Sequence, residues 1–397
     1  MTTPPQLPLA GIRVVEFVHM VMGPTCGLVL ADLGAEVIKV EPTPDGDNTR
    51  RLTGSGVGFF VNFNRNKKSL IVDMKTPEGR AIVDRLVASA DVVTENFRPG
   101  AMEKLGLGYE QLKARHPGII YASHKGFLDG PYETRTALDE VVQMMGGLAY
   151  MTGLPGRPLR AGTSVNDIMG GMFAAIGVLA ALLERKETGR GKLVRSALFE
   201  NCAFLVSQHM AAYAMTGRAL PPMSIRVAAW AIYDVFETGD GQQIFFAVVS
   251  DTQWAAFCEA VGWQARLADP ALKTNNLRVA ARPTLLPEIE ALLRGMTRDE
   301  VIALAERAGL PYAPIIRPED LFEDPHLNAS GGLADTVLPD GRHARLPTLP
   351  LDLDGRRLPK RLDPPGPGAH SREILEGLGY PDAEIERLGA AGVVRLG

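Results

Sequence analysis

The sequence predicts an α/β protein that combines a parallel, doubly wound sheet with a second, smaller α+β domain. Three observations support this prediction. Short apolar runs alternate with amphipathic segments between residues 11 and 126, the composition changes after Glu184, and a strand hairpin followed by helices occupies 230–309. Strands that alternate with helices are typical of parallel sheets, whereas hairpins join antiparallel strands.

The alternating part contains five expected strands, at 11–17, 36–42, 68–74, 91–97 and 118–126. The helices between them are expected at 23–35, where Gly34 ends the helix, at 76–90, and between the last two strands. Thr76 is the expected N-cap and Pro77 the first helical residue, because proline lacks the N–H that this position leaves unbonded.

Polar and aromatic side chains gather in the loops that follow these strands: His19, Asn96, Phe97, Arg98, Lys104, His124 and Lys125. The carboxyl ends of parallel strands share one edge of a sheet, and ligands bind there in doubly wound proteins. One crevice is therefore expected to collect these residues.

A long helix follows, with an apolar run at 168–183 that is shorter than the roughly 20 residues needed to span a bilayer, so a buried helix is expected. A basic, glycine-broken link at 184–194 leads to more helix at 196–215 and a proline-rich turn. The smaller domain should then contain two strands joined at Gly239–Gly241. After its helices, the chain returns through a proline and glycine linker to a final helix pair from Arg372.

The composition argues against several classes of function. The formal net charge is −4 over 397 residues, with no basic stripe interleaved with aromatic side chains, so nucleic acid is not an expected partner. Cys26, Cys202 and Cys258 show no CxxC spacing, which favours a reducing compartment. The first residues lack the pattern of a signal peptide. We therefore expect a cytoplasmic protein with no membrane partner.

Familiar catalytic motifs are missing from the sequence. There is no GxGxxG after the first strand and no GxxxxGK[ST], which disfavours a nucleotide cofactor. There is also no GxSxG and no HExxH, and the histidines are dispersed singly. Neither a classical serine hydrolase nor a metal site is expected.

Asp167 stands at the start of the apolar helix, with Gly170 and Gly171 one turn inside it. One interpretation is structural, because aspartate is a favoured N-cap. In the other, the glycines let a substrate approach and offer amide N–H groups to a developing oxyanion, and Asp167 is a nucleophile. A carboxylate is a weak nucleophile, so it would need an activated acyl donor such as a thioester.

Several long motifs resemble the family III CoA-transferases, the group of formyl-CoA transferase, carnitine CoA-transferase and the α-methylacyl-CoA racemases. The motifs occur in the right order over nearly the whole chain, at 9–17, 23–50, 60–80, 90–112, 165–191, 309–327 and 368–380. The resemblance implies that Asp167 is the nucleophile, and that aspartyl anhydride and aspartyl-CoA thioester intermediates form on it. It also implies that no metal or nucleotide cofactor takes part.

The resemblance further implies a CoA site along the carboxyl ends of the N-terminal strands, made of His19, Met20, Val21, Met22, Asp73, Met74, Lys75, Asn96, Phe97, Arg98 and Lys104. Cations and backbone amides suit the anionic end of CoA. Glu140 matches a position near the nucleophile and is expected to orient or protonate reacting oxygens.

In domain terms, the resemblance implies a large Rossmann-like, CoA-binding domain at 1–195 that 330–397 completes. A linker at 196–225 and a small α+β domain at 226–324 follow, and 325–397 forms a linker and the return to the large domain. It also implies an interlocked, ring-like homodimer, a feature that sequence patterns alone do not reveal.

Two departures from the family narrow the expected activity. The racemases carry a histidine just before the helix that corresponds to DEVVQMMGG, and Thr136, Ala137 and Leu138 stand there instead. The glycine run of formyl-CoA transferase is absent between Arg218 and Thr252, which disfavours formate and oxalate as substrates.

Three arginines, Arg135, Arg160 and Arg226, are either surface residues or a clamp for a second substrate carboxylate. The clamp predicts dicarboxylic substrates, with succinyl-CoA as a donor and a free carboxylic acid as acceptor. Three hypotheses stay open: a CoA-transferase, an acyl-CoA racemase or isomerase on the same fold, and a CoA-binding protein without catalysis.

Overall fold

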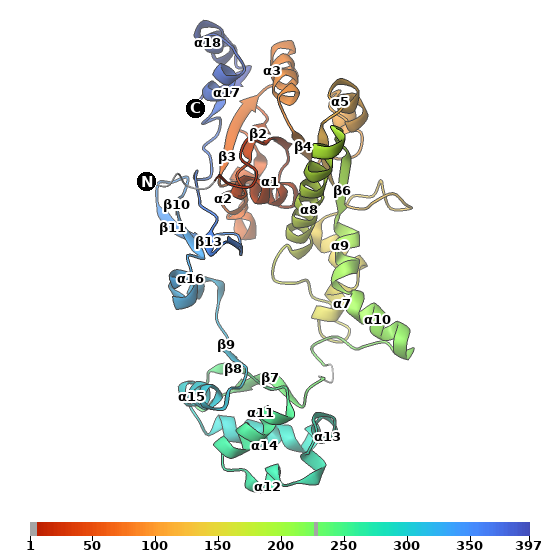
Figure 1. Cartoon of the computed structure of the whole chain (residues 1–397), viewed down its shortest axis with the longest axis vertical. Coiled ribbons are helices and arrows are strands. Elements are labelled where there is room, and N and C mark those ends of the chain that lie inside the picture. Colours follow the sequence, from red (N-terminus) through yellow and green to blue (C-terminus); the bar gives the residue numbers. More distant parts are fainter. Residues whose placement is uncertain (1–5, 226–228) are drawn as a thin grey trace. The chain divides into compact units, whose positions relative to one another are not determined.

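The computed structural model describes residues 6–225 and 229–397, which belong to two compact units. The first unit contains Met1–Ser224 and Pro325–Gly397, and the second contains Ile225–Asp324 (Figure 1). The small domain predicted at 226–324 has the same last residue as the second unit and a first residue one position later.

Within the described residues, the main sheet of the first unit has seven strands in the order β14-β3-β2-β1-β4-β5-β6. Their bounds are β1 Arg13–Phe17, β2 Glu36–Glu41, β3 Lys67–Val72, β4 Val92–Glu95, β5 Ile120–Lys125, β6 Leu193–Ala197 and β14 Val394–Arg395. Strands β1 to β6 run parallel, and β14 pairs antiparallel with β3. The predicted α/β class and parallel sheet are confirmed. The strand order reverses between β1 and β4, and this reversal opens a crevice at the carboxyl ends of the strands.

Helices cover both faces of this sheet. The cluster on one face joins α1 (Met22–Asp32) and α8 (Val165–Thr188) to Val14 and Val37, and the cluster on the other face contains Val15 and Ile38. Neighbouring residues of one strand thus lie in opposite cores, as expected of a strand buried on both sides. The second face carries α3 Pro77–Ala88, α5 Tyr109–Arg115, α17 Ser371–Gly377 and α18 Asp382–Ala390.

Local signals in the sequence explain where α3 begins. The Thr76 hydroxyl accepts the Gly79 N–H at 3.0 Å, and Pro77 is the first helical residue, as predicted. The C-terminal helices α17 and α18 complete the same face from the far end of the chain: they lie beside β3 and β14 and are blue in Figure 1, where β3 is orange.

Several elements of the first unit differ from the prediction. The link expected at 184–194 is the end of α8 and the start of β6, which pairs with β5 through backbone hydrogen bonds that residue type does not reveal. By contrast, the helix expected at 196–215, within the predicted linker at 196–225, is confirmed and consists of α9 (Leu198–Leu205) and α10 (Ser207–Thr216). The remaining short elements are α2 Phe59–Phe63, α4 Ala101–Lys104, α6 Asp139–Met145, α7 Leu148–Thr152, α16 Pro325–Ala329, β10 Leu333–Val337, β11 His343–Pro347, β12 Asp352–Leu353 and β13 Arg356–Arg357.

Helix α8 is longer than the apolar run that predicted it. By length and composition alone its 24 residues could cross a membrane, although 44% of its apolar window is buried within the chain. It packs against α1, β5 and β6, and these contacts make it a core helix of the first unit.

The second unit is an α+β structure. Its sheet has the order β7-β8-β9, and the turn between the first two strands includes Gly241, whose φ of 71° suits glycine. The predicted hairpin is therefore confirmed. The elements are β7 Ile232–Glu237, β8 Gln243–Val248, β9 Tyr312–Pro314, α11 Asp251–Ala260, α12 Gln264–Leu267, α13 Asn275–Ala280, α14 Arg282–Arg294 and α15 Arg298–Ala308.

Candidate active site

A cleft of about 870 Å³ opens where the central strands of the first unit end. Its wall contains residues that follow five of these strands, including His19 after β1, Pro42 after β2, Met74 after β3, Asn96 after β4 and Gly126 after β5. Because the strand order reverses between β1 and β4, this position is the switch point at which doubly wound proteins bind ligands.

The Asn96 side chain holds the backbone of His19 at this cleft. Its Oδ1 accepts the His19 N–H at 3.0 Å and lies 2.9 Å from Nδ1, and its Nδ2 donates to the His19 carbonyl at 2.8 Å. The His19 ring lies 5.9 Å from that of Phe97, measured between centroids. Residues predicted from two separate loops therefore form one part of the wall.

The structure places some of the predicted CoA-site residues in the cleft wall and others outside it. Those in the wall are His19, Met74, Asn96, Phe97 and Arg98. Met20 is partly exposed beside it, and the side chains of Val21 and Met22 are buried, with 1% and 4% exposed. Asp73 accepts the backbone N–H of Lys75 at 3.0 Å, and Lys75 and Lys104 are exposed. The CoA-site assignment stays a prediction for each of these residues.

His124 and Lys125 end β5 and also line the cleft. Burial, together with the charges of Lys125 and Lys67, lowers the pKa of His124 to about 3. The ring is therefore neutral near neutral pH, with Nε2 lying 2.7 Å from the Thr94 hydroxyl. Lys125 lies in the cleft wall and pairs with Glu95 at 2.9 Å.

Asp167 is not the N-cap of α8. The N-cap residue is Ser164, and the oxygen that accepts from the first turn belongs to Asp139 of α6. Asp139 Oδ2 accepts the backbone N–H of Asn166 at 2.8 Å and that of Asp167 at 3.1 Å. Within residues 6–225 and 229–397, no group donates a hydrogen bond to the Asp167 carboxylate. The cap and the candidate nucleophile are thus two different aspartates.

Gly170 and Gly171 serve the packing of α8 on α1. A Cβ atom on Gly171 would lie 2.4 Å from the Met22 carbonyl oxygen, and one on Gly170 would lie 2.5 Å from Met22 Cε. The expectation that these glycines open a path for substrate is therefore wrong, because the neighbouring helix fills that space.

Burial and the negative charge of Asp139 together raise the pKa of Asp167 to about 7, against the opposing positive charge of Arg160. A more basic carboxylate is a better nucleophile, and one that titrates near 7 is still substantially ionised at neutral pH. The first turn of α8 therefore holds a carboxylate suited to attack an acyl carbon.

Asp139 is held in turn by Gln143, one turn further along α6. Gln143 Nε2 donates to Asp139 Oδ1, and Gln143 Oε1 accepts the Ala161 N–H at 2.8 Å. Both side chains are buried, with 6% of Asp139 and none of Gln143 exposed. Leu138, directly before Asp139 in the sequence, lines the cleft, whereas Asp139 and Asp167 are not among the residues of the cleft wall.

The predicted catalytic partner Glu140 lies next to this pair in sequence, with 57% of its side chain exposed in an ion pair with Arg160 at 3.0 Å. Sequence reasoning named Glu140 and missed Asp139. The i, i+4 spacing of Asp139 and Gln143 on one helix face was the signal that could have found it.

The three arginines of the predicted clamp have different surroundings. Arg160 is the partner of Glu140, and Arg135 lines the cleft with its guanidinium carbon 5.0 Å from the centre of the Tyr132 ring. Arg226 lies outside the described residues.

Comparison with known proteins assigns the family. The family model described as CoA-transferase family III matches residues 9–371. The chain belongs to this family. It is therefore an enzyme of the CoA-transferase type, a class whose substrates are CoA thioesters.

Similar family III members include a succinyl-CoA–D-citramalate CoA-transferase of Chloroflexus aurantiacus, which is 34% identical over 98% of this chain and 99% of the relative. A succinate–glutarate CoA-transferase of Agrobacterium fabrum is 35% identical over 94% of this chain and 96% of the relative. Among solved structures, a CAIB/BAIF family protein from Brucella suis matches with a TM-score of 0.83 and 34% identity, over 94% of this chain and all of that one.

Proposed function

We propose that the protein transfers CoA from succinyl-CoA, or from another dicarboxylyl-CoA, to a free carboxylic acid, with Asp167 as the nucleophile. The observation that carries this proposal is the half-buried Asp167 carboxylate at the start of α8, with a pKa raised to about 7 and no hydrogen-bond donor within the described residues. The names of the relatives from Chloroflexus aurantiacus and Agrobacterium fabrum, both with succinyl or succinate as one substrate, support the choice of donor.

In the first half of the reaction, an Asp167 oxygen attacks the thioester carbonyl carbon of the donor. The carbon–sulfur bond breaks, CoA leaves as a thiolate, and a mixed anhydride joins Asp167 to the acyl group. The thiolate then attacks the Asp167 carboxyl carbon of the anhydride. The donor acid leaves as a carboxylate, and Asp167 carries CoA as a thioester.

In the second half, the carboxylate of the acceptor attacks this aspartyl thioester. The carbon–sulfur bond breaks again, and a second anhydride joins Asp167 to the acceptor. The thiolate attacks the acceptor's carbonyl carbon, which releases the new CoA thioester and regenerates the Asp167 carboxylate. Each step exchanges one acyl bond for another, so neither ATP nor a metal ion enters the balance.

The cleft offers suitable contacts for both substrates. The side chains of Arg98 and Lys125 present positive charge to the phosphates of CoA, and His19 is fixed at the same wall by Asn96. Arg135 reaches the cleft near Leu138, where it would meet the second carboxylate of a dicarboxylic acyl group.

We also propose that the enzyme is a cytoplasmic homodimer. A row of apolar side chains on α8, namely Met172, Phe173, Ile176 and Leu183, is exposed in the single chain, and Phe204 of α9 packs against Phe173 at 5.6 Å. Exposed apolar patches of this kind mark interaction surfaces. The three cysteines are free and buried, which suits a reducing compartment.

A direct assay tests the proposal. Purified protein is incubated with succinyl-CoA, and separately with acetyl-CoA, in the presence of mono- and dicarboxylic acids, and new CoA thioesters are followed by mass spectrometry. Asp167→Ala should lower the rate by about 10⁴-fold or more, as expected when a covalent nucleophile is lost. Hydroxylamine should inactivate the wild type only after acyl-CoA is added. Deuterium uptake next to the thioester, without any new thioester, would contradict the proposal and indicate a racemase.

A further inference from the structure

Six charged side chains are buried directly beneath the loop that joins β1 to α1, residues 18–21. We call them the buried ion network: Glu16, Lys39, Glu41, Asp47, Arg50 and Lys67. Five of them have at most 5% of their surface exposed, and the Arg50 side chain has 10%. Burying ion pairs brings little net stability, because each charge loses its hydration. The network therefore calls for a role besides stability.

The buried ion network contains three acids and three bases, so its formal charges balance. Lys67 Nζ lies 2.9 and 3.0 Å from the two carboxylate oxygens of Glu16. Lys39 pairs with Asp47 at 2.9 Å. The Asp47 N–H donates to Glu41 at 2.8 Å, and Arg50 donates two hydrogen bonds of 2.7 Å to the same Glu41 carboxylate.

Members of the network also hold the backbone at both ends of the β1–α1 loop. Lys39 Nζ donates to the Val18 carbonyl at 2.6 Å, and Lys67 Nζ donates to the Pro24 carbonyl in the first turn of α1 at 2.9 Å. Both lysines are fully buried: Lys67 Nζ also donates to Glu16 and to the Asn64 side chain, and Lys39 forms its ion pair with Asp47. The loop is thus fastened to charged groups that cannot move into solvent.

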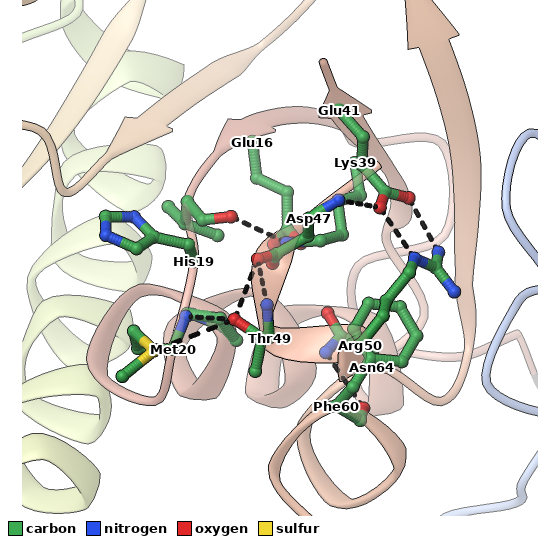
Figure 2. Close-up of polar contacts among 12 residues, drawn as sticks. Glu16, His19, Met20, Lys39, Glu41, Asp47, Thr49, Arg50, Phe60 and Asn64 are labelled. Atoms are coloured by element: carbon green, nitrogen blue, oxygen red, sulfur yellow. Dashed lines mark hydrogen bonds and ion pairs between the residues drawn. The ribbon is translucent and has the colours of Figure 1, made fainter. Parts of the chain in front are cut away.

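Thr49 connects the middle of the loop to the same network. Its hydroxyl accepts the Met20 N–H at 2.9 Å and donates to Asp47 Oδ1 at 2.7 Å. Figure 2 shows Met20, Thr49 and Asp47 joined in this order, with Lys39 next to Asp47. The Thr49 hydroxyl therefore links the buried charges to the backbone turn at Met20 by two hydrogen bonds.

The Met20 backbone needs such support. Its φ is 63°, in the left-handed region that residues other than glycine rarely adopt. A residue keeps such a conformation only where its surroundings enforce it. At this reversal His19 and Met20 face outward, with 37% of Met20 exposed, whereas Val21 and Met22 turn into the core.

We infer that Thr49 and the buried ion network are positioning groups that hold the β1–α1 loop in the form that presents His19 and Met20 to the cleft. This inference rests on the proposed function, because the proposed function makes the loop part of the CoA site. Neither Thr49 nor the six ions need touch the substrate, since Lys39, Lys67 and Thr49 act through the backbone that they hold.

Three variants of the full-length protein test this inference. Thr49→Val keeps the shape of the side chain but removes the hydroxyl, and Thr49→Ser keeps the hydroxyl. Ser69→Ala is the matched control, because the Ser69 hydroxyl donates to Glu41 at 2.6 Å in the same network and does not contact the loop. Hydrogen–deuterium exchange of residues 18–21 is measured without ligand, the CoA affinity is measured by calorimetry, and thermal unfolding shows whether each variant folds.

We expect Thr49→Val to speed exchange in the loop and to weaken CoA binding about tenfold, the effect of losing one ordering hydrogen bond. Thr49→Ser should keep the loop exchange and the CoA affinity of the wild type. Ser69→Ala should change neither of these, although it lowers the unfolding temperature. Unchanged loop exchange in Thr49→Val, or an equal change in Ser69→Ala, would overturn the inference. A wild type that shows the exchange pattern but transfers no CoA would instead refute the proposed function.

Discussion

Beneath the β1–α1 loop, each buried carboxylate contacts a cation, whereas at the start of α8 two carboxylates lie together and, within the described residues, neither has an ion pair. Burial by itself raises the pKa of Glu41, but hydrogen bonds and charge from Arg50 outweigh it, so this pKa lies below its ordinary value. At Asp167 burial and Asp139 act in the same direction, and the pKa rises to about 7. The carboxylates beneath the loop are compensated by cations, and Asp139 is bonded to backbone N–H groups, whereas within the described residues the Asp167 carboxylate has neither a cation nor a hydrogen-bond donor and is available for chemistry.

The largest effect on stability is expected from Lys39→Met, which removes the cation from one of the compensated carboxylates beneath the loop. It leaves Asp47 buried without its cation, and removing one partner of a buried pair costs about 3–5 kcal/mol. Urea unfolding measures the change. Lys68→Met is the control, because Lys68 pairs with Glu36 and Glu373 near the surface, where a pair contributes about 1 kcal/mol or less. Equal losses would show that the two kinds of pair do not differ.

Asp139→Asn tests the uncompensated side. In the wild type, kcat/KM should fall as the pH drops through about 7, because protonated Asp167 is not a nucleophile. We call this fall the acidic limb of the pH profile. Without the charge of Asp139 the pKa of Asp167 falls, so this limb should move to lower pH by about one unit. The double variant Asp139→Asn, Gln143→Glu keeps the hydrogen-bond pattern and moves the charge one group away, so its limb should lie between the two. A limb that does not move would show that Asp139 acts only as a cap.

Arg160→Gln should shift the same limb in the opposite direction and by less. The guanidinium lowers the pKa of Asp167, so its removal raises that pKa and moves the limb to higher pH. Arg160 is partly exposed and pairs with Glu140, which screens its effect. Repeating the pH profile at high salt should erase most of the difference between Arg160→Gln and the wild type. A shift to lower pH would mean that another charge controls Asp167.

The smallest expected effect concerns the stability of Asp167→Asn. The folded-state pKa of about 7 lies above the ordinary value of 3.8, so the folded protein binds more protons than the unfolded chain between these values. Wild-type stability should therefore decline as the pH rises from 3.8 to about 7 through this group, and Asp167→Asn should lack that decline. Thermal unfolding above about pH 7 should show the variant more stable than the wild type. Identical pH dependence in both proteins would contradict the raised pKa.

Elements with strong local signals were predictable. Alternating apolar strands and helices gave the parallel sheet, and Thr76 with Pro77 gave the start of α3. The strands β6 and β14 were missed, because their membership depends on hydrogen bonds to β5 and β3, which are distant in sequence. The site shows the same limit: the role of Asp167 as a nucleophile stays a prediction, and the glycines after it were assigned to substrate access although they pack on Met22.

The sequence by itself determined the α/β class, the residues that follow the strands, and the aspartate at the start of the apolar helix, because these depend on periodicity, turn residues and motifs within short segments. Only the tertiary structure decided that Asp139 accepts the first N–H groups of α8, that the Asp167 carboxylate has no hydrogen-bond donor among residues 6–225 and 229–397, and that Thr49 supports Met20. Asp139 and Asp167 are 28 positions apart, and Met20 and Thr49 are 29 apart. Contacts between such residues form only when the folded sheet brings their loops together, and burial then sets the charge that each carboxylate carries.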